Sequence, residues 1–248
     1  MALSLMRKQG TYKPDVVTYM ALSLMRKQGT SKPDVVTYMA LSLMRKQGTY
    51  KPDVVTYTAM IDGHCLQNKM DKARGVFQLM IKEDCSPDIH SYNVLINGYC
   101  KAKRLDEAIE LFNEISRTGP TPNNVTYNTL MQGMFQLGRV DDVCKLLGKM
   151  LAFGLVPSQV TFLILLGGLF KSGKLKDALK NFQAMQNSGL ELDIIFYNVV
   201  IDGLCKAGHF EDAKELFREL SINGLQPDVY TYTILINGFC KGGSIPVV

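Results

Sequence analysis

Short hydrogen-bonding side chains recur at one register of the sequence, spaced 35 residues apart. This register holds, in chain order, Thr58, Asn93, Asn128, Leu163, Asn198 and Thr233. Asn and Thr are poor helix formers, so helix propensity does not explain their presence in segments that are otherwise apolar. A position that is merely exposed would often carry Lys, Glu or Gln, and none of the six is one of these. The pattern indicates that a small hydrogen-bonding group is required once per 35 residues.

Lysines keep the same spacing at a second register: Lys101, Lys171, Lys206 and Lys241. They fall near the end of a predicted helix, where a cation stabilises the negative C-terminus. The alternative is a row of cations, one per repeat, that suits a polyanion with regularly spaced phosphates. A general basic patch is not indicated beyond residue 53, because the first 53 residues carry a net charge of 9 − 3 = +6 and the remaining chain carries 19 − 20 = −1.

Cysteine chemistry is not indicated, although the chain has six cysteines. Four of them share one register: Cys65, Cys100, Cys205 and Cys240. Phe135 and Phe170 take the same place in other units, and phenylalanine neither binds metal nor forms a disulfide, so we expect core thiols. Cys85 and Cys144 lack CxxC spacing, which disfavours zinc and favours a reducing compartment. The sequence predicts no metal, no cofactor and, without a phosphate loop, HExxH or nucleophile motif, no enzyme.

The elements that position these residues follow the same 35-residue period. Glycines mark it at Gly63, Gly98, Gly133, Gly168, Gly203 and Gly238. An aromatic six residues earlier and a small residue ten later recur with them, which is the signature of a solenoid. Each unit contains two apolar stretches with helical spacing, such as "IHSYNVLINGYCKA" and "LDEAIELFNEISRTG". We therefore predict an all-α solenoid of helix-turn-helix repeats.

Turn residues separate these helices. The second helix of a unit ends at a glycine that we expect in the left-handed conformation: Gly119, Gly154, Gly189 and Gly224. A Pro-Asp or Pro-Asn step often follows, in which proline ends the old helix and Asp or Asn caps the next. The predicted full repeats are 54–88, 89–123, 124–158, 159–193 and 194–228, followed by a partial sixth repeat at 229–248.

Residues 1–53 follow a different period, because the first 57 residues are three nearly identical 19-residue copies. Each copy joins the opening of a first helix, "VVTY", to the close of a second, "LMRKQG". This segment is either a run of single helices that continues the stack or a partly ordered leader. "MALSLMRKQG" recurs inside the chain, so we expect repeat body and no targeting peptide. No apolar run reaches the length of a membrane span.

The long repeats resemble pentatricopeptide repeat (PPR) proteins of the P class, with 35-residue units. The motifs that carry the resemblance are "VVTYTAMIDGHC", "SYNVLINGYCKA", "VTYNTLMQGMFQLG", "FYNVVIDGLCKAG" and "YTYTILINGFCKGG". The resemblance covers residues 54–248, and "DGLCKAG" is similar to the fertility-restorer branch of plant mitochondria. It implies a right-handed α-solenoid superhelix that binds single-stranded RNA, one base per repeat, in organellar RNA processing or stabilisation. A mitochondrial location is expected, with the chloroplast as the alternative.

In this family, the fifth residue of a repeat bonds the base edge and the last residue refines the choice. Thr58 with Asp88 resembles a guanine reader, and Asn93 with Asn123 a cytosine reader. Asn128 with Ser158 suggests a pyrimidine reader, with cytosine as the preferred base. Leu163 with Asp193 is non-discriminating, because the leucine side chain cannot form a hydrogen bond with a base. Asn198 with Asp228 resembles a uracil reader, and Thr233 suggests a purine. The implied target is 5′-G-C-(C or U)-N-U-(purine)-3′.

The resemblance also assigns the second residue of each repeat to base stacking. These residues are Val55, His90, Val125, Val160, Ile195 and Tyr230. His90 and Tyr230 depart from the usual aliphatic residue, and the four periodic lysines match a phosphate-contacting position. Met20 and Met39 fill the fifth position in the shortened units, where we expect no base reading.

Three further expectations concern the competing functions and the last helix. The competing function is a peptide-binding scaffold of the tetratricopeptide (TPR) kind, which the 35-residue step and the Asn/Thr register argue against. An RNA-processing enzyme would need a catalytic domain that "GGSIPVV" does not begin. The sixth first helix lacks its partner, so we expect Leu235, Ile236 and Phe239 to be exposed and to promote self-association.

Overall fold

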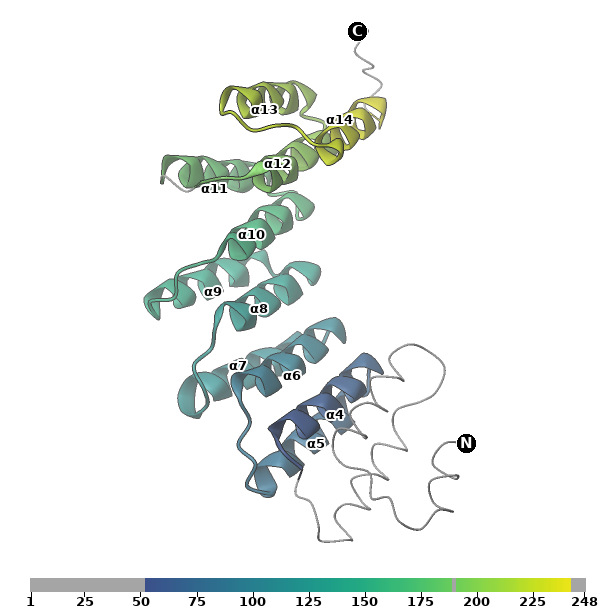
Figure 1. Cartoon of the computed structure of the whole chain (residues 1–248), viewed down its shortest axis with the longest axis vertical. Helices are drawn as coiled ribbons and strands as arrows, with labels where there is room; N and C mark the ends of the chain where they lie inside the picture. The colour runs from purple at the N-terminus through teal and green to yellow at the C-terminus, as the bar shows by residue number, and fades with distance from the viewer. Residues whose placement is uncertain (1–51, 189–190, 242–248) are drawn as a thin grey trace, which may run out of the picture. The chain divides into compact units, whose positions relative to one another are not determined.

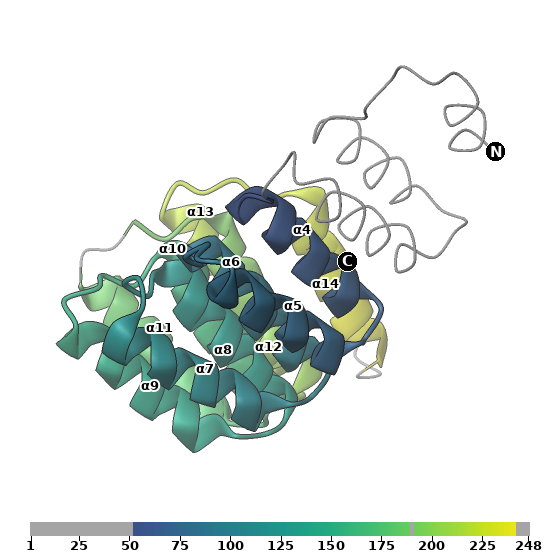
Figure 2. The same cartoon turned by 90° about the horizontal axis from the view of Figure 1, so that it is seen from below.

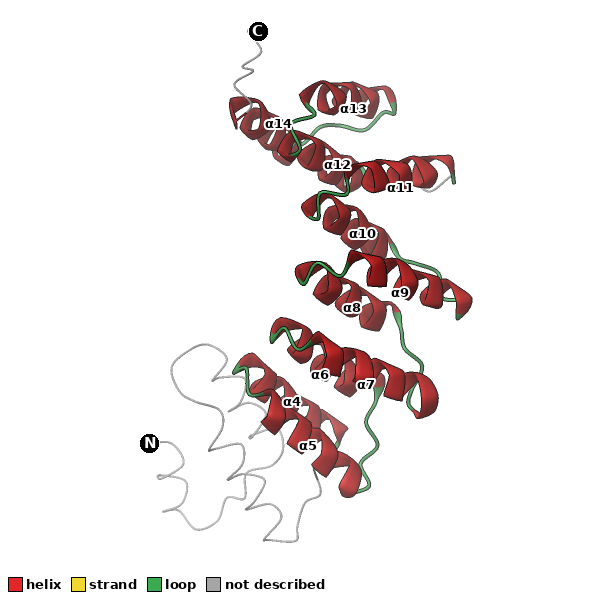
Figure 3. Ribbon diagram, turned by 180° about the vertical axis from the view of Figure 1, so that it is seen from behind, coloured by secondary structure: helices red, strands yellow, loops and turns green. Residues whose placement is uncertain are grey.

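The computed structural model describes residues 52–188 and 191–241, which form eleven helices and, within these ranges, no strand (Figure 1, Figure 3). The prediction of an all-α fold is confirmed. The shortened 19-residue units lie almost wholly outside the described residues, so neither interpretation of them is tested. None of the described helices is long and apolar enough to cross a bilayer.

The chain divides into two compact units, and the first comprises residues up to Thr121. Its described helices are α4 (Val54–Leu66), α5 (Met70–Lys82), α6 (Ile89–Lys101) and α7 (Leu105–Thr118). Helix α4 packs against both α5 and α6, and α6 packs against α7 (Figure 2). The first helices of successive predicted repeats are therefore direct neighbours in this unit.

The second unit begins at Pro122 and repeats this arrangement. Its described helices are α8 (Asn124–Gln136), α9 (Val140–Ala152), α10 (Gln159–Lys171), α11 (Leu175–Asn187), α12 (Ile194–Lys206), α13 (Phe210–Ile222) and α14 (Val229–Lys241). Helix α10 contacts α8 on one side and α12 on the other, and α12 also contacts α14 (Figure 1). Helices α8, α10, α12 and α14 thus form one row, with the second helices packed behind them.

Polar side chains begin the first helices, as the sequence predicts. The N-cap residues are Asp53, Asp88, Asn123, Ser158 and Asp193, and each accepts a hydrogen bond from a backbone N–H of the first turn. Asp228 does the same for α14, where its Oδ1 accepts from the Thr231 N–H at 2.7 Å. These bonds satisfy N–H groups that have no partner within the helix.

The glycines after the second helices do not all behave alike. Gly154 and Gly224 have φ values of 73° and 77°, so the predicted left-handed conformation is confirmed at these two positions. It is wrong for Gly119, which is extended with φ −96° and ψ −169°. Pro120 follows directly, and the residue before a proline is forced away from helical conformations. Gly189 lies outside the described residues.

Four of the periodic glycines, at Gly98, Gly168, Gly203 and Gly238, lie directly against a side chain of the preceding first helix. A Cβ atom added at Gly98 would lie 2.4 Å from Cys65 Sγ, and one added at Gly168 would lie 2.3 Å from the Phe135 ring. The close approach requires a residue without a side chain at this position. The cysteine register is therefore a packing register, in agreement with the sequence-based interpretation.

The individual cysteines refine this picture. Cys100 is buried, and burial raises the pKa of its thiol to about 12. Cys205 is buried too and its pKa is also raised, above all by burial. The expectation of a core thiol is wrong for Cys240, which is exposed, and Cys65 is half-buried.

The expected exposure of the last helix is also corrected. Leu235 and Phe239 are buried, each with 8% of its surface exposed, whereas Ile236 is 61% exposed. Phe239 packs against α13, with its ring 5.9 Å from Phe210 and Lys214 Nζ 5.3 Å from its centroid. Two of the three residues therefore face neighbouring helices and offer no surface for self-association.

Candidate nucleic-acid interface

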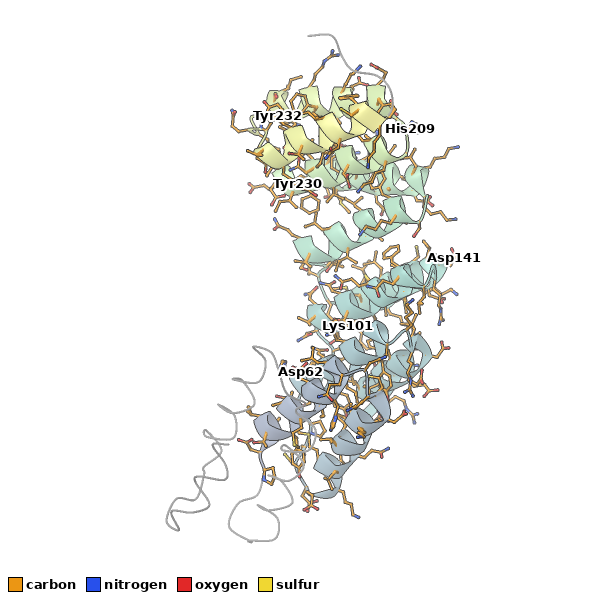
Figure 4. All side chains as sticks on the ribbon, turned by 90° about the vertical axis from the view of Figure 1, so that its right-hand side faces the viewer. Asp62, Lys101, Asp141, His209, Tyr230 and Tyr232 are labelled. Atoms are coloured by element: carbon orange, nitrogen blue, oxygen red, sulfur yellow. The ribbon has the colours of Figure 1, made fainter. Side chains whose placement is uncertain are left out.

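Apolar side chains project from the first helices at the second position. Val55, Val125, Val160, Ile195 and Tyr230 are all more than half exposed. His90 completes the register and is exposed as well, and Tyr230 is marked on α14 in Figure 4. Exposing an apolar side chain at every first helix forgoes the stabilisation that burial provides. The arrangement leaves one flat or branched apolar contact per helix available to a ligand.

The fifth-position side chains lie one turn further along these helices and are less accessible. Thr58, Asn93 and Asn198 are buried, and Asn128 and Leu163 are half-buried. Thr233 is exposed, and its hydroxyl donates to the carbonyl of Val229 at 2.7 Å. The fifth and second positions together give four of the six first helices a polar group beside an apolar one, whereas α6 has His90 at the second position and α10 has Leu163 at the fifth.

Two fifth-position asparagines have an unsatisfied acceptor. Within the described part of the chain, the buried Oδ1 atoms of Asn128 and Asn198 accept no hydrogen bond. A buried polar atom without a partner costs about 1–3 kcal/mol. A ligand N–H group that reached these oxygens would remove this cost.

The structure brings two of the predicted base-reading pairs together. Asn198 Nδ2 donates to Asp228 Oδ1 at 3.4 Å, so the fifth and last residues of this repeat are in direct contact. Thr58 and Asp88 are joined through Ser91, whose Oγ lies 2.6 Å from Thr58 Oγ1 and 2.8 Å from Asp88 Oδ1.

Two other pairs, both within the second unit, are not joined in this way. Among the described residues, no hydrogen bond joins Asn128 to Ser158. Leu163 has no polar group that could bond Asp193.

A polar register that the sequence analysis missed is the third residue of each first helix. It holds Thr56, Ser91, Thr126, Thr161, Phe196 and Thr231. Its signal was visible, because a hydroxyl residue recurs three positions after the cap at the 35-residue spacing. The backbone and hydroxyl bonds that Thr231 donates hold the pKa of the Asp228 carboxyl below its ordinary value. The last-position carboxylate therefore stays ionised at neutral pH.

The four periodic lysines are exposed at the C-terminal ends of their helices, and Lys101 is marked in Figure 4. Lys206 Nζ lies 2.5 Å from Asp202 Oδ2, one helical turn earlier. Asn97, Gly167 and Asn237 replace that aspartate beside the other three lysines. Lys206 is thus the one of the four with a carboxylate at the preceding turn.

Metal binding has no structural support in residues 52–188 and 191–241. No group of three or more His, Cys, Asp or Glu side chains there could hold a metal ion.

Paired helices with a repeated polar and apolar register define a modular helical-repeat protein. Family models of the PPR repeat family match residues 52–101, 87–136, 122–171 and 192–241, and a PPR repeat model matches residues 160–190. These matches cover most of the sequence, and the chain belongs to the PPR repeat family.

Solved structures agree with this fold. PPR10 from maize is 22% identical with a TM-score of 0.61, over 98% of this chain and 39% of PPR10. PPR10 in complex with an 18-nt psaJ RNA element gives 23% identity and a TM-score of 0.71, over 96% of this chain and 34% of the other. Nuclear proteinaceous RNase P 2 from A. thaliana is 12% identical with a TM-score of 0.57, over 75% of this chain and 42% of the RNase P chain. The chain thus spans less than half the length of these proteins, and a comparison with curated proteins gives no match.

Proposed function

We propose that this chain binds single-stranded RNA with one base at each first helix, and that it selects the base at every first helix except that of Leu163. The observation that carries the proposal is the pair of buried, unsatisfied amide oxygens of Asn128 and Asn198, two repeats apart at the fifth position. The terminal torsion of asparagine is broad, so the amide can turn toward a ligand without strain. A base edge supplies the donors and acceptors that such an amide requires.

The neighbouring registers support a nucleic acid over other polar ligands. Exposed apolar residues at the second position can stack on any base, because every base has a π-face. The exposed lysines can contact phosphates at the same one-per-repeat interval. PPR10, which shares the fold, has been solved with an RNA element bound.

The base assignments follow from the fifth and last positions. The target that they imply remains 5′-G-C-(C or U)-N-U-(purine)-3′, beginning at the repeat of Thr58 and Asp88. The direct contact between Asn198 and Asp228 makes uracil at the fifth nucleotide the best supported assignment. Leu163 leaves the fourth nucleotide unselected.

The biological setting is proposed from sequence motifs. The 35-residue units and the "DGLCKAG" wording favour a P-class protein similar to plant fertility restorers, acting in mitochondria or, as the alternative, chloroplasts. Its role would be to bind and protect or expose a transcript, without catalysis of its own.

A binding experiment tests the function. Labelled RNA with the target sequence should bind more tightly than RNA of the same composition in scrambled order, and a peptide library should not compete. Equal binding of both RNAs would show that the chain binds RNA without sequence specificity. Binding of peptides without RNA binding would favour the TPR-like scaffold instead.

A further inference from the structure

The hydroxyl residues at the third position of the first helices contact the N-cap residue of the same helix. Five of the six residues at this position carry a hydroxyl, and each hydroxyl oxygen lies 2.7–3.2 Å from a side-chain oxygen of the preceding N-cap residue. That N-cap residue is also the last position of the preceding repeat, which refines base choice in the proposed function. The hydroxyl therefore contacts a residue that would face the RNA.

The hydrogen bonds around α14 extend from the third position to the fifth. Asp228 Oδ1 accepts from the Thr231 hydroxyl at 2.8 Å, from the Thr231 N–H at 2.7 Å and from Asn198 Nδ2 at 3.4 Å. Because Thr231 fixes this carboxylate oxygen, the amide nitrogen of Asn198 turns toward it. The amide oxygen of Asn198 is then the group left for a ligand, as its missing partner within the described residues indicates.

The same connection exists in the first unit with different chemistry. Ser91 Oγ donates to Asp88 Oδ1 at 2.8 Å, since the carboxylate is the stronger acceptor, and lies 2.6 Å from Thr58 Oγ1. The proton of Thr58 then goes to Ser91 or to the Val54 carbonyl at 2.7 Å. In both cases the lone pairs of Thr58 remain for a donor, which suits the N–H groups on the edge of guanine.

The exception to the hydroxyl register coincides with the repeat that cannot read a base. Phe196 stands at the third position after Asp193, whose Oδ1 accepts only backbone bonds from the residues that the structure describes, namely from Ile195 at 3.0 Å and Phe196 at 3.4 Å. Leu163 occupies the fifth position of that same repeat. The fifth-position polar group and the third-position hydroxyl are thus absent together.

We propose that the third-position hydroxyl is a positioning residue for base selection in the preceding repeat. Through the last-position residue, it fixes which donors and acceptors the fifth position presents to RNA. This inference rests on the proposed function. It assigns Thr231 to the uracil-reading repeat and Ser91 to the guanine-reading repeat.

The test replaces Thr231 by Val, which keeps the branched shape and removes the hydroxyl. The preference of Thr231→Val for uracil over cytosine at the fifth nucleotide should fall about fivefold, as expected for an unmet hydrogen bond. Thr231→Ser should restore it. Thr161→Val is the matched control, because it removes the same group at the same register two repeats earlier and should leave the fifth-nucleotide preference unchanged.

A purely structural role predicts a different result. Loss of a helix cap lowers binding of all RNAs together and does not change the ratio at one nucleotide. An unchanged ratio in Thr231→Val, or equal changes in both valine variants, would overturn the inference while the proposed function stands. A wild-type chain without preference at the fifth nucleotide would overturn both.

Ser91→Ala provides a second variant with a smaller change in volume, should Thr231→Val fail to fold. Its preference for guanine over adenine at the first nucleotide should fall by a similar factor, with the fifth nucleotide unaffected. An unchanged preference at the first nucleotide would contradict the inference.

Discussion

Helices α10 and α12 are neighbours in the second unit, yet only α12 carries a hydrogen-bonding side chain at the fifth position. Val160 and Ile195 occupy the second position and are exposed to nearly the same extent, 55% and 51%. The fifth position is Leu163 in α10 and Asn198 in α12. The exposed apolar side chain at the second position is therefore independent of the hydrogen-bonding group at the fifth, and a repeat without that group keeps its place in the row.

The two helices also differ at their ends. Lys206 of α12 is paired with Asp202, whereas Gly167 stands one turn before Lys171 of α10. Helix α12, which carries Asn198, thus has its cation partly neutralised. Helix α10, which carries Leu163, has a lysine with no ion pair among the described residues. We expect α10 to contribute mainly through phosphate and α12 mainly through the base.

The largest effect should come from the packing that joins the two helices. A Cβ atom at Gly203 would lie 2.3 Å from the ring of Phe170, so Gly203→Ala should lower the free energy of unfolding by about 1–3 kcal/mol through overpacking. Gly167→Ala is the control, because nothing lies within 4 Å of its added Cβ. It should stabilise the helix by roughly 0.5–1 kcal/mol. Urea unfolding of both variants distinguishes them, and equal shifts would contradict the packing role of Gly203.

The next effect is a change of base preference in α12. Asn198→Thr should turn the preference at the fifth nucleotide from uracil toward guanine, while stacking on Ile195 and Tyr230 persists. The expected change is about 5- to 150-fold, since an unpaired buried polar edge costs about 1–3 kcal/mol. Binding of two RNAs that differ only as U or G at this nucleotide measures it. If both proteins bind both RNAs equally, the fifth position does not read bases.

A gain of preference in α10 should be smaller. Leu163→Asn should create a preference for uracil at the fourth nucleotide of about 2- to 10-fold, because one hydrogen bond contributes about 0.5–1.5 kcal/mol net. Phe196 leaves Asp193 without a hydroxyl partner, so the gain should stay below the preference of the α12 repeat. Competition among four RNAs that differ at the fourth nucleotide measures it, with the fifth nucleotide as the internal reference.

The smallest effect concerns the lysines. Four phosphate contacts predict a slope of log K against log salt near −3, from about −0.7 per contact with a single strand. Lys171→Gln should reduce the slope by about 0.7, and Lys206→Gln by less, since Asp202 already neutralises part of its charge. A slope near zero in the wild-type chain would remove the lysines from the interface.

Helix pairs and their caps were predictable because each signal is local. An Asp, Asn or Ser cap lies within three residues of the N–H group that it accepts from, so sequence spacing alone locates it. The extended conformation of Gly119 was also a local effect of Pro120, although the glycine pattern concealed it. The contact of Gly98 with Cys65 needed the structure, because it joins two different helices.

For the proposed interface, the sequence predicted which repeat positions take part but not the contacts between their side chains. The sequence located the second, fifth and last positions, but their roles toward RNA remain predictions. It also treated Phe239 as exposed, because the packing of Phe239 against Phe210 depends on how helices stack. The Ser91 link between Thr58 and Asp88 depends on side-chain geometry, which spacing does not reveal.

In the proposed function, the last position has two roles, and the first limits the second. Every first helix of the described chain begins at Asp, Asn or Ser, and stable capping adds only Thr and Gly as further good choices. Folding therefore restricts the residue types that are available to refine base choice. A repeat whose last residue is of another type loses a helix cap together with that refinement.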